Sequence, residues 1–170
     1  MKDLMKLLAV LLISVLSLST ANAQTLKFGH VDLQALIQVM PEKATAITEL
    51  EAFQTDLEDI LGEMQKDYQT KLTEFEQMGE TVSEIKRNAK VAEIKDVEQR
   101  IQNYQVTANQ QLQQKQNEVM KPIYDKAQAA IGEVAKEQGL IYVFEVNSLI
   151  YKSNQSMDVL PLVKKKLGIE

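Results

Sequence analysis

The chain has 170 residues, a net charge of −5 from 24 acidic and 19 basic side chains, and no cysteine. The lack of cysteine excludes a disulfide framework, so packing and assembly must stabilise the fold. An acidic chain is a poor candidate for nucleic-acid binding, and this length predicts a single domain.

The first 23 residues have the pattern of a secretory signal peptide. A short start with two lysines precedes an apolar run from Leu7 to Leu18, and Ala21-Asn22-Ala23 forms a cleavage site of small residues. The run is shorter than the ~20 residues that span a bilayer. We therefore expect cleavage after Ala23 and export. The removed segment holds two lysines and one aspartate, so residues 24–170 carry 17 basic and 23 acidic side chains, a net charge of −6.

A short strand and a short helix are predicted next. Leu26–Asp32 alternates weakly between apolar and polar residues, which indicates a strand. Asp32 can cap a helix over Leu33–Met40, and Pro41 ends that helix or starts the next one.

A long helix is predicted from Glu42 to Met78. Its large apolar residues recur at steps of four and three in an eleven-residue repeat, about 3.67 residues per turn. The repeat consists of Ala46, Leu50, Phe53, Leu57, Leu61, Met64, Tyr68, Leu72 and Phe75. Such spacing keeps one apolar stripe on a nearly straight helix, and a second helix is needed to bury it.

The chain then reverses and returns. Gly79 suits the positive-φ position after a helix, and Thr81 with Glu84 forms a capping box for the next one. The return helix, Val82–Glu118, is as long as the first, so each would reach about 55 Å. Its apolar residues are Val82, Ile85, Ala89, Ile94, Val97, Ile101, Tyr104, Ala108 and Leu112, with Val119 just beyond.

After the return helix the pattern changes. A kinked continuation past Pro122 should end at Gly139, and Leu140–Val146 is the strongest strand of the chain. A turn at Val146-Asn147-Ser148 leads to a further strand, Leu149–Tyr151, and Asn154 to Ser156 should form a loop. A last helix, capped by Ser156 or Asp158, should end before Gly168.

These elements predict an α+β fold in one domain over residues 24–170. Residues 42–118 form a long antiparallel helical-hairpin (coiled-coil) arm, and residues 24–41 and 119–170 form a small three-stranded β base. A sheet of this size is a marginal core, so we expect assembly through the base. Candidate residues for that contact are Phe28, Val31, Ile141, Val143, Phe144, Ile150 and Tyr151.

The residue inventory argues against an enzyme. His30 is the only histidine, so no metal set or catalytic triad can be completed around it, and a structural role is expected. No phosphate loop or nucleophile motif is present, and no cofactor is expected. The basic residues Lys86, Arg87 and Lys90 have acidic neighbours that largely neutralise them.

The arm is the candidate interaction surface. Met and aromatic side chains pack between helices and also adapt to varied partners. The candidates for such contacts are Phe53, Met64, Tyr68, Phe75, Met78 and Tyr104. Gln99–Glu118 contains eight Gln and three Asn. This segment is either a solvated helix or a wall of amides that faces a cavity, and the sequence leaves both open.

The whole arrangement resembles the Skp/OmpH family of periplasmic chaperones. The most specific part is C-terminal, where a hydrophobic strand with an acidic residue (Val143-Phe144-Glu145) leads through Asn147-Ser148 to Ile150-Tyr151 and then Asp158. Glu145 stands where the family more usually has Asp. In the arms the resemblance rests on architecture.

The resemblance implies a homotrimer whose arms enclose a cavity. It also implies a periplasmic holdase that binds unfolded outer-membrane β-barrel proteins and prevents their aggregation without ATP. Family members can be strongly basic, whereas this chain is acidic, which argues against contact with lipopolysaccharide or an anionic membrane. The alternative is an envelope scaffold, a coiled-coil protein that binds a folded partner.

Overall fold

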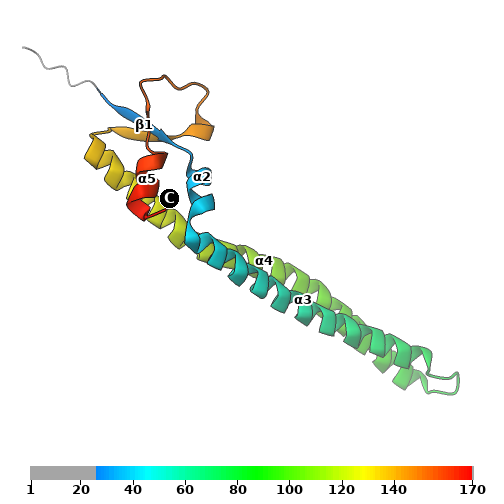
Figure 1. Cartoon of the computed structure of the whole chain (residues 1–170). Coiled ribbons are helices and arrows are strands. Elements are labelled where there is room, and N and C mark those ends of the chain that lie inside the picture. The colour runs from blue at the N-terminus through cyan, green and yellow to red at the C-terminus, as the bar shows by residue number, and fades with distance from the viewer. Residues whose placement is uncertain (1–25, 170) are drawn as a thin grey trace, which may run out of the picture.

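The computed structural model describes residues 26–169, and the expected signal peptide lies outside them (Figure 1). A small base of strands and short helices lies at one end, and two long helices project from it (Figure 1). The elements in chain order are β1 (Phe28–Val31), α2 (Leu33–Val39), α3 (Pro41–Glu76), α4 (Glu84–Gln138), β2 (Tyr142–Glu145), the 3₁₀ helix η1 (Val146–Ser148), β3 (Met157–Asp158) and α5 (Leu160–Leu167). The predicted α+β fold, a helical-hairpin arm on a three-stranded base, is confirmed.

The sheet is parallel, with β1 at its centre and the order β2-β1-β3. Gly29 pairs with Val143 and Met157, and His30 pairs with Phe144 and Asp158. Because side chains alternate along a strand, Phe28 and His30 lie on one face of the sheet. Gly29 and Val31 lie on the other face, toward the helices.

The helices cover that second face and form the core with it. The buried apolar side chains of the base come from β1, α2, the base end of the two long helices and the α5 region. They are Val31, Leu36, Ile37, Met40, Ala46, Val119, Ile123, Ala127, Ala130, Val134, Val159 and Val163. Gly29 is required here, because a Cβ would lie 2.7 Å from Leu140 Cδ1 and 3.2 Å from Val159 Cγ1.

The caps explain where α2 and α5 begin and where α4 and α5 end. The Asp32 carboxylate accepts a hydrogen bond of 2.8 Å from the Ala35 N–H, so the predicted cap of α2 is confirmed. Gly139 and Gly168 end α4 and α5 in the left-handed conformation, at φ 64° and 70°. The Asp158 carboxylate accepts a hydrogen bond of 3.0 Å from the Leu160 N–H, which is the first backbone N–H of α5.

The arm is a pair of antiparallel helices, α3 and the first part of α4. α3 has 36 residues, and α4 runs for 55 residues through Pro122 into the base. Every position of the predicted stripe on α3 is buried or partly buried, so the eleven-residue spacing identified the packed face.

The tip differs from the prediction. α3 ends at Glu76 with Gln77 as its C-cap in the right-handed region, and Gly79 does not have a positive φ. α4 begins at Glu84 after Ser83, and no side chain caps it. The predicted glycine cap and the Thr81 capping box are therefore wrong, because a longer turn with its own backbone bonds, such as Val82 N–H to Gly79 O, makes the reversal.

The third strand also differs. Leu149–Tyr151 is not a strand but part of the loop that rises from the sheet (Figure 1). The third strand is Met157–Asp158. It follows the expected loop directly and includes Asp158, which was expected to be a helix cap. The reason is that β1 offers only one free edge, and the chain reaches it at residues 157–158 after passing over the sheet.

Candidate interaction surfaces

All six candidate residues of the arm are partly buried. Five of them lie on α3 or α4, and the sixth, Met78, lies in the turn at the tip. Among the large side chains of the arm in the described part of the chain, Val97 is 2% exposed and Leu57 is 9% exposed, and the others are less buried. The Tyr104 hydroxyl donates to the Leu57 carbonyl oxygen at 3.3 Å, which ties α4 to α3 near the middle of the arm. Phe75 lies under the Arg87 guanidinium, 5.6 Å from ring centroid to Cζ.

Two open pockets along the arm contain candidate tyrosines. One, of 590 Å³, is lined by Tyr68 and Ile101 together with glutamines and two charged residues. The other, of 230 Å³, is lined by Tyr104, Leu57 and Leu112 with amides around them. Gln105 lines both. Amides of the Gln-rich segment therefore border hollows in the arm, as well as facing solvent.

Sequence reasoning missed the most exposed apolar side chains of the arm. Ile85 is 82% exposed and Val106 is 60% exposed, and Ile47 and Ile60 are also exposed. Ile85 belonged to the predicted return stripe, but it lies in the first turn of α4, beyond the packed part of the hairpin. Ile47, Ile60 and Val106 are apolar residues outside the predicted stripes. An apolar residue at such a position indicates an exposed apolar side chain, so the sequence did contain a signal for these three.

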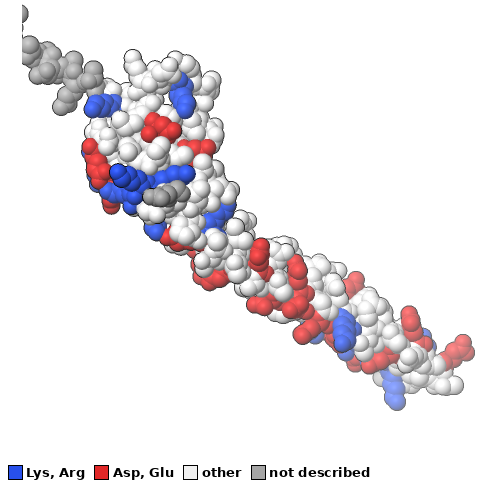
Figure 2. Space-filling view, in the orientation of Figure 1, with Lys and Arg blue, Asp and Glu red and all other residues white. Residues whose placement is uncertain are grey.

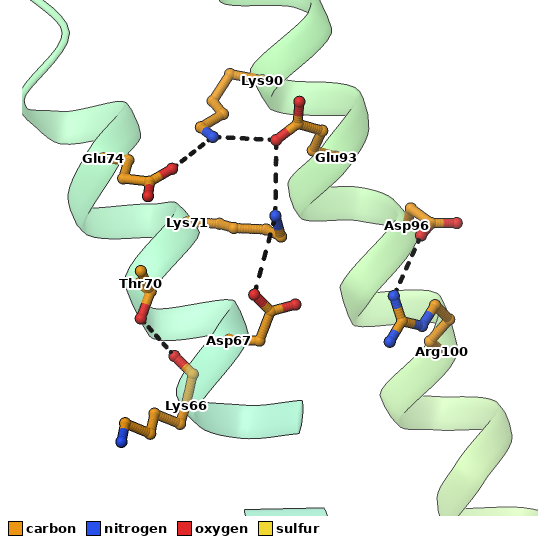
Figure 3. Close-up of polar contacts among 9 residues, drawn as sticks. All are labelled: Lys66, Asp67, Thr70, Lys71, Glu74, Lys90, Glu93, Asp96 and Arg100. Atoms are coloured by element: carbon orange, nitrogen blue, oxygen red, sulfur yellow. Dashed lines mark hydrogen bonds and ion pairs between the residues drawn. The ribbon is translucent and has the colours of Figure 1, made fainter. Parts of the chain in front are cut away.

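An ion-pair network joins the two helices near the tip (Figure 3). Lys90 of α4 lies 2.5 Å from Glu74 of α3 and 3.0 Å from Glu93, and Lys71 lies 3.7 Å from Glu93. The hydrogen bond from Lys90 lowers the pKa of Glu93, and the hydrogen bond to Glu74 raises the pKa of Lys90. The basic cluster near the tip is thus neutralised in part by carboxylates, as predicted.

Charge is distributed unevenly between arm and base. Residues 42–118 hold 16 acidic and 9 basic side chains, whereas the rest of 24–170 holds 7 acidic and 8 basic ones. Figure 2 shows acidic side chains along the arm and a group of basic ones on the base. The negative charge that the sequence places on the chain is therefore concentrated on the arm.

The base exposes an aromatic face. Phe28, Tyr142 and Phe144 lie together on the outer face of the sheet, with ring centroids 5.9 to 6.4 Å apart. All three are exposed, as are Ile141, Ile150 and Tyr151. Sequence reasoning missed Tyr142, although its spacing of two from Phe144 indicates the same face.

Two of the predicted contact residues of the base lie elsewhere. Val31 is in the core and Val143 packs against it, so neither contributes to the exposed face. Leu149, Tyr151 and neighbouring residues of the loop border an open pocket of 370 Å³ with Phe28 and Phe144. The exposed base surface is therefore made by the outer sheet face and the loop together.

His30 is buried and fully engaged by polar partners. Its Nδ1 lies 2.9 Å from Ser156 Oγ and its Nε2 lies 2.9 Å from Lys152 Nζ. The carboxylate of Asp32, two residues further along the chain, caps α2. Within residues 26–169, no cluster of three or more possible metal ligands is present, and no helix has the length and apolarity needed to cross a membrane.

Comparison with known proteins identifies the family that has this architecture. The family model OmpH, described as outer membrane protein (OmpH-like), matches residues 27–167. The chain belongs to the OmpH-like family. This match covers both the base and the arm.

Individual relatives are distant but nearly full-length. A protein of Aquifex aeolicus (strain VF5), uncharacterised, is 27% identical over 154 residues, which cover 91% of this chain and 93% of that protein. The chaperone protein Skp of Blochmanniella pennsylvanica (strain BPEN) is 23% identical over 158 residues, which cover 93% and 95%. The crystal structure of a proposed OmpH-like outer membrane chaperone from Caulobacter crescentus CB15 covers 88% of each chain with a TM-score of 0.71 at 10% identity, and it supports the same fold.

Proposed function

We propose that this OmpH-like protein is a periplasmic chaperone that binds unfolded outer-membrane β-barrel proteins and prevents their aggregation without ATP. The observation that carries the proposal is the long, thinly packed arm on a family member whose relative is a chaperone. A holding surface needs no catalytic geometry, and none is expected from the residues of this chain.

The arm is suited to an unfolded client. Half-buried aromatic and Met side chains, exposed Ile and Val, and amide-lined hollows offer many weak contacts along the arm. Unfolded chains expose apolar side chains and unpaired backbone groups, and these contacts match both. Because no contact requires a fixed sequence, the arm fits many clients of one class.

The base is suited to self-association. A three-stranded sheet with an exposed aromatic face is a poor end state for a single chain, because exposed apolar patches of this kind mark interaction sites. We propose that the base holds a homotrimer, as the family resemblance implies, so that several arms surround one client.

The first test measures protection from aggregation by residues 24–170. A β-barrel outer-membrane protein is diluted from urea, and light scattering is followed with and without the purified protein. We expect scattering to be suppressed at about one assembly per client. A protein lacking 57–105, with a short glycine turn that joins Asp56 to Val106, should keep the oligomer and lose protection. Full scattering with the intact protein would contradict the proposal.

A second test addresses the arm surface directly. Replacing Ile60 and Val106 by Ser removes two exposed apolar side chains without opening a core, so the fold should be kept while protection falls several-fold. The matched control is Leu162→Ser on α5, which removes an exposed apolar side chain of the base. Equal protection by both variants would show that the client does not use this surface.

A third test addresses the base. Tyr151→Asp introduces a charge at a side chain that is 81% exposed, so it should reduce self-association and leave the monomer folded. Ile85→Asp, at an equally exposed position near the tip, is the control and should leave the oligomer intact. The readout is mass by light scattering coupled to gel filtration.

The alternative is an envelope scaffold that binds a folded partner. A pull-down dominated by one folded protein, with no protection of unfolded clients, would favour that function. Export is tested separately by the intact mass of the protein recovered from cells, which should begin at Gln24.

A further inference from the structure

The only histidine of the chain lies at a junction between the sheet and the loop above it. His30 on β1 is 5% exposed, and both of its ring nitrogens have partners from that loop. Nδ1 is 2.9 Å from Ser156 Oγ, and Nε2 is 2.9 Å from Lys152 Nζ. The chaperone function proposed above makes no use of this cluster.

The partners fix the protonation state that this geometry requires. A lysine ammonium has three donors and no acceptor, so the Nε2 that it contacts must carry a lone pair. The ring proton then lies on Nδ1 and is donated to the Ser156 hydroxyl oxygen. The contact is therefore made by a neutral imidazole in a single tautomer.

These two contacts anchor a specific segment. Lys152 and Ser156 lie in residues 149–156, between η1 and β3. Within the described part of the chain, the other hydrogen bonds of this segment are local, such as Leu149 N–H to Val146 O and Ser156 N–H to Ser153 O. Ile150 and Tyr151 of this segment are exposed, and the segment borders the pocket formed with Phe28 and Phe144.

We propose that His30 is a proton-sensitive latch that holds the 149–156 loop when neutral and releases it when protonated, which changes the base surface used for assembly. Protonation puts a second N–H donor and a positive charge against the Lys152 ammonium, so that contact must break. The effect on assembly rests on the proposed function, whereas the release of the loop does not.

The charged groups near the His30 ring determine how protonation of the ring changes its contacts. On β3, the carboxylate of Asp158, the register partner of His30, is held by the Leu160 N–H. On β2 the partner is the uncharged Phe144, and the next residue, Glu145, accepts from the Leu33 N–H at 2.9 Å. Asp32, beyond the end of β1, caps α2. Protonation thus weakens the interaction with Lys152, and histidines ordinarily change charge between pH 5 and 8.

The direct test follows the ring and the loop in residues 24–170 from about pH 8 to about pH 5. Nitrogen-15 NMR should show the Nδ1–H tautomer at the upper pH and imidazolium at the lower one. Hydrogen exchange of residues 149–156, corrected for the intrinsic pH dependence, should accelerate on the order of tenfold, as expected when a hydrogen bond to a charged group is lost. Exchange in α5 should change much less.

Variants separate the latch from general acid effects. His30→Asn cannot titrate, so its exchange at 149–156 should show no step with pH. Lys152→Met keeps the aliphatic stem and removes the ammonium, so exchange should already be fast at the upper pH and the step should shrink. Lys121→Met removes an exposed lysine of α4 that pairs with Asp125. This control should retain the full step.

Three results would overturn the inference. They are an Nε2–H tautomer at the upper pH, imidazolium formation without faster loop exchange, and an unchanged step in His30→Asn. Native mass at both pH values tests the link to assembly. A wild-type oligomer that weakens at low pH, with His30→Asn unaffected, supports it. A monomer at both pH values with a pH-dependent loop would contradict the proposed assembly and leave the loop latch standing.

Discussion

The base and the arm of this chain use similar residues but differ in how completely they bury them. In the base, one face of the sheet, α2, α5 and the base ends of α3 and α4 together enclose side chains such as Leu36, Val134 and Val163. In the arm, one helix meets one other helix, and most stripe residues stay partly exposed. The number of elements around a side chain, more than its apolarity, sets how much it stabilises the fold.

This difference predicts two levels of local stability in one chain. Partial burial gives each arm residue only part of the ~1.5–3 kcal/mol available from full burial, while each helical residue still loses ~1–2 kcal/mol of backbone entropy. The arm should therefore open more readily than the base, and its tip most readily. Such an arm can adapt to cargo while the base keeps its shape.

The largest expected effect compares one leucine from each region. Leu36→Ala, at a side chain with 0% exposure, should cost about 2–5 kcal/mol of unfolding free energy, because it leaves a cavity in an enclosed core. Leu57→Ala in the arm should cost about 2 kcal/mol or less, because the cavity opens to solvent. Urea unfolding followed by circular dichroism measures both. Equal losses would remove the distinction between the regions.

The second effect concerns the close approach of strand and helix in the base. Gly29→Ala places a Cβ within 2.7 Å of Leu140 Cδ1 and 3.4 Å of the Met157 carbonyl oxygen. We expect a loss of about 1–3 kcal/mol, as for other overpacked cores, measured by the same unfolding experiment. Double replacement with Leu140→Val should recover part of the loss. No recovery would show that Val159 Cγ1 or the backbone of β3, and not Leu140, resists the methyl group.

A third, smaller effect should have the opposite sign. Gly62 lies within α3, with no atom near enough to contact an added Cβ, so Gly62→Ala should stabilise the helix by about 0.5–1 kcal/mol. Gly132 in the base part of α4 has equally open space and is the matched control. Hydrogen exchange should slow around residue 62 in the first variant only. If Gly62→Ala also protects the client less well, then the flexibility of the arm contributes to client binding.

The smallest effect is the pH response of the tip. Because Lys90 lowers the pKa of Glu93, the network stabilises the hairpin at pH values above the ordinary range of a glutamate. That contribution should be lost as pH falls through the lowered pKa, and also at high pH as Lys90, whose pKa is raised, loses its proton. Exchange of residues 71–93 measures this, with Glu93→Gln as the variant that lacks the acid response. The effect should be slight, because these side chains are solvated.

Much of the fold was predictable because periodicity reports burial. The eleven-residue stripe of α3, the Asp32 cap and the glycines after α4 and α5 each depend on local sequence and were confirmed. The third strand was missed because β3 has only two residues, and it is defined by pairing with β1 rather than by its own pattern. The Leu149–Tyr151 segment has strand-like residues, yet within the described residues it pairs with no strand and belongs to the loop between η1 and β3.

The candidate surfaces were harder to predict than the fold. A helical stripe identifies residues that pack against the partner helix, so Phe53 or Met64 emerge from the sequence as partly buried positions. The exposed side chains of Ile60 and Val106 interrupt the polar faces and carry no periodic signal. The contacts of His30 with Lys152 and Ser156 join residues more than 120 positions apart, which no local pattern indicates.

The most direct test of the central claim is the native mass of residues 24–170 with and without an unfolded outer-membrane β-barrel protein. We expect a homotrimer held by its base, and a second species heavier by one client when the client is added. A monomer that forms no complex with the client would contradict both the proposed role of the base and that of the arm.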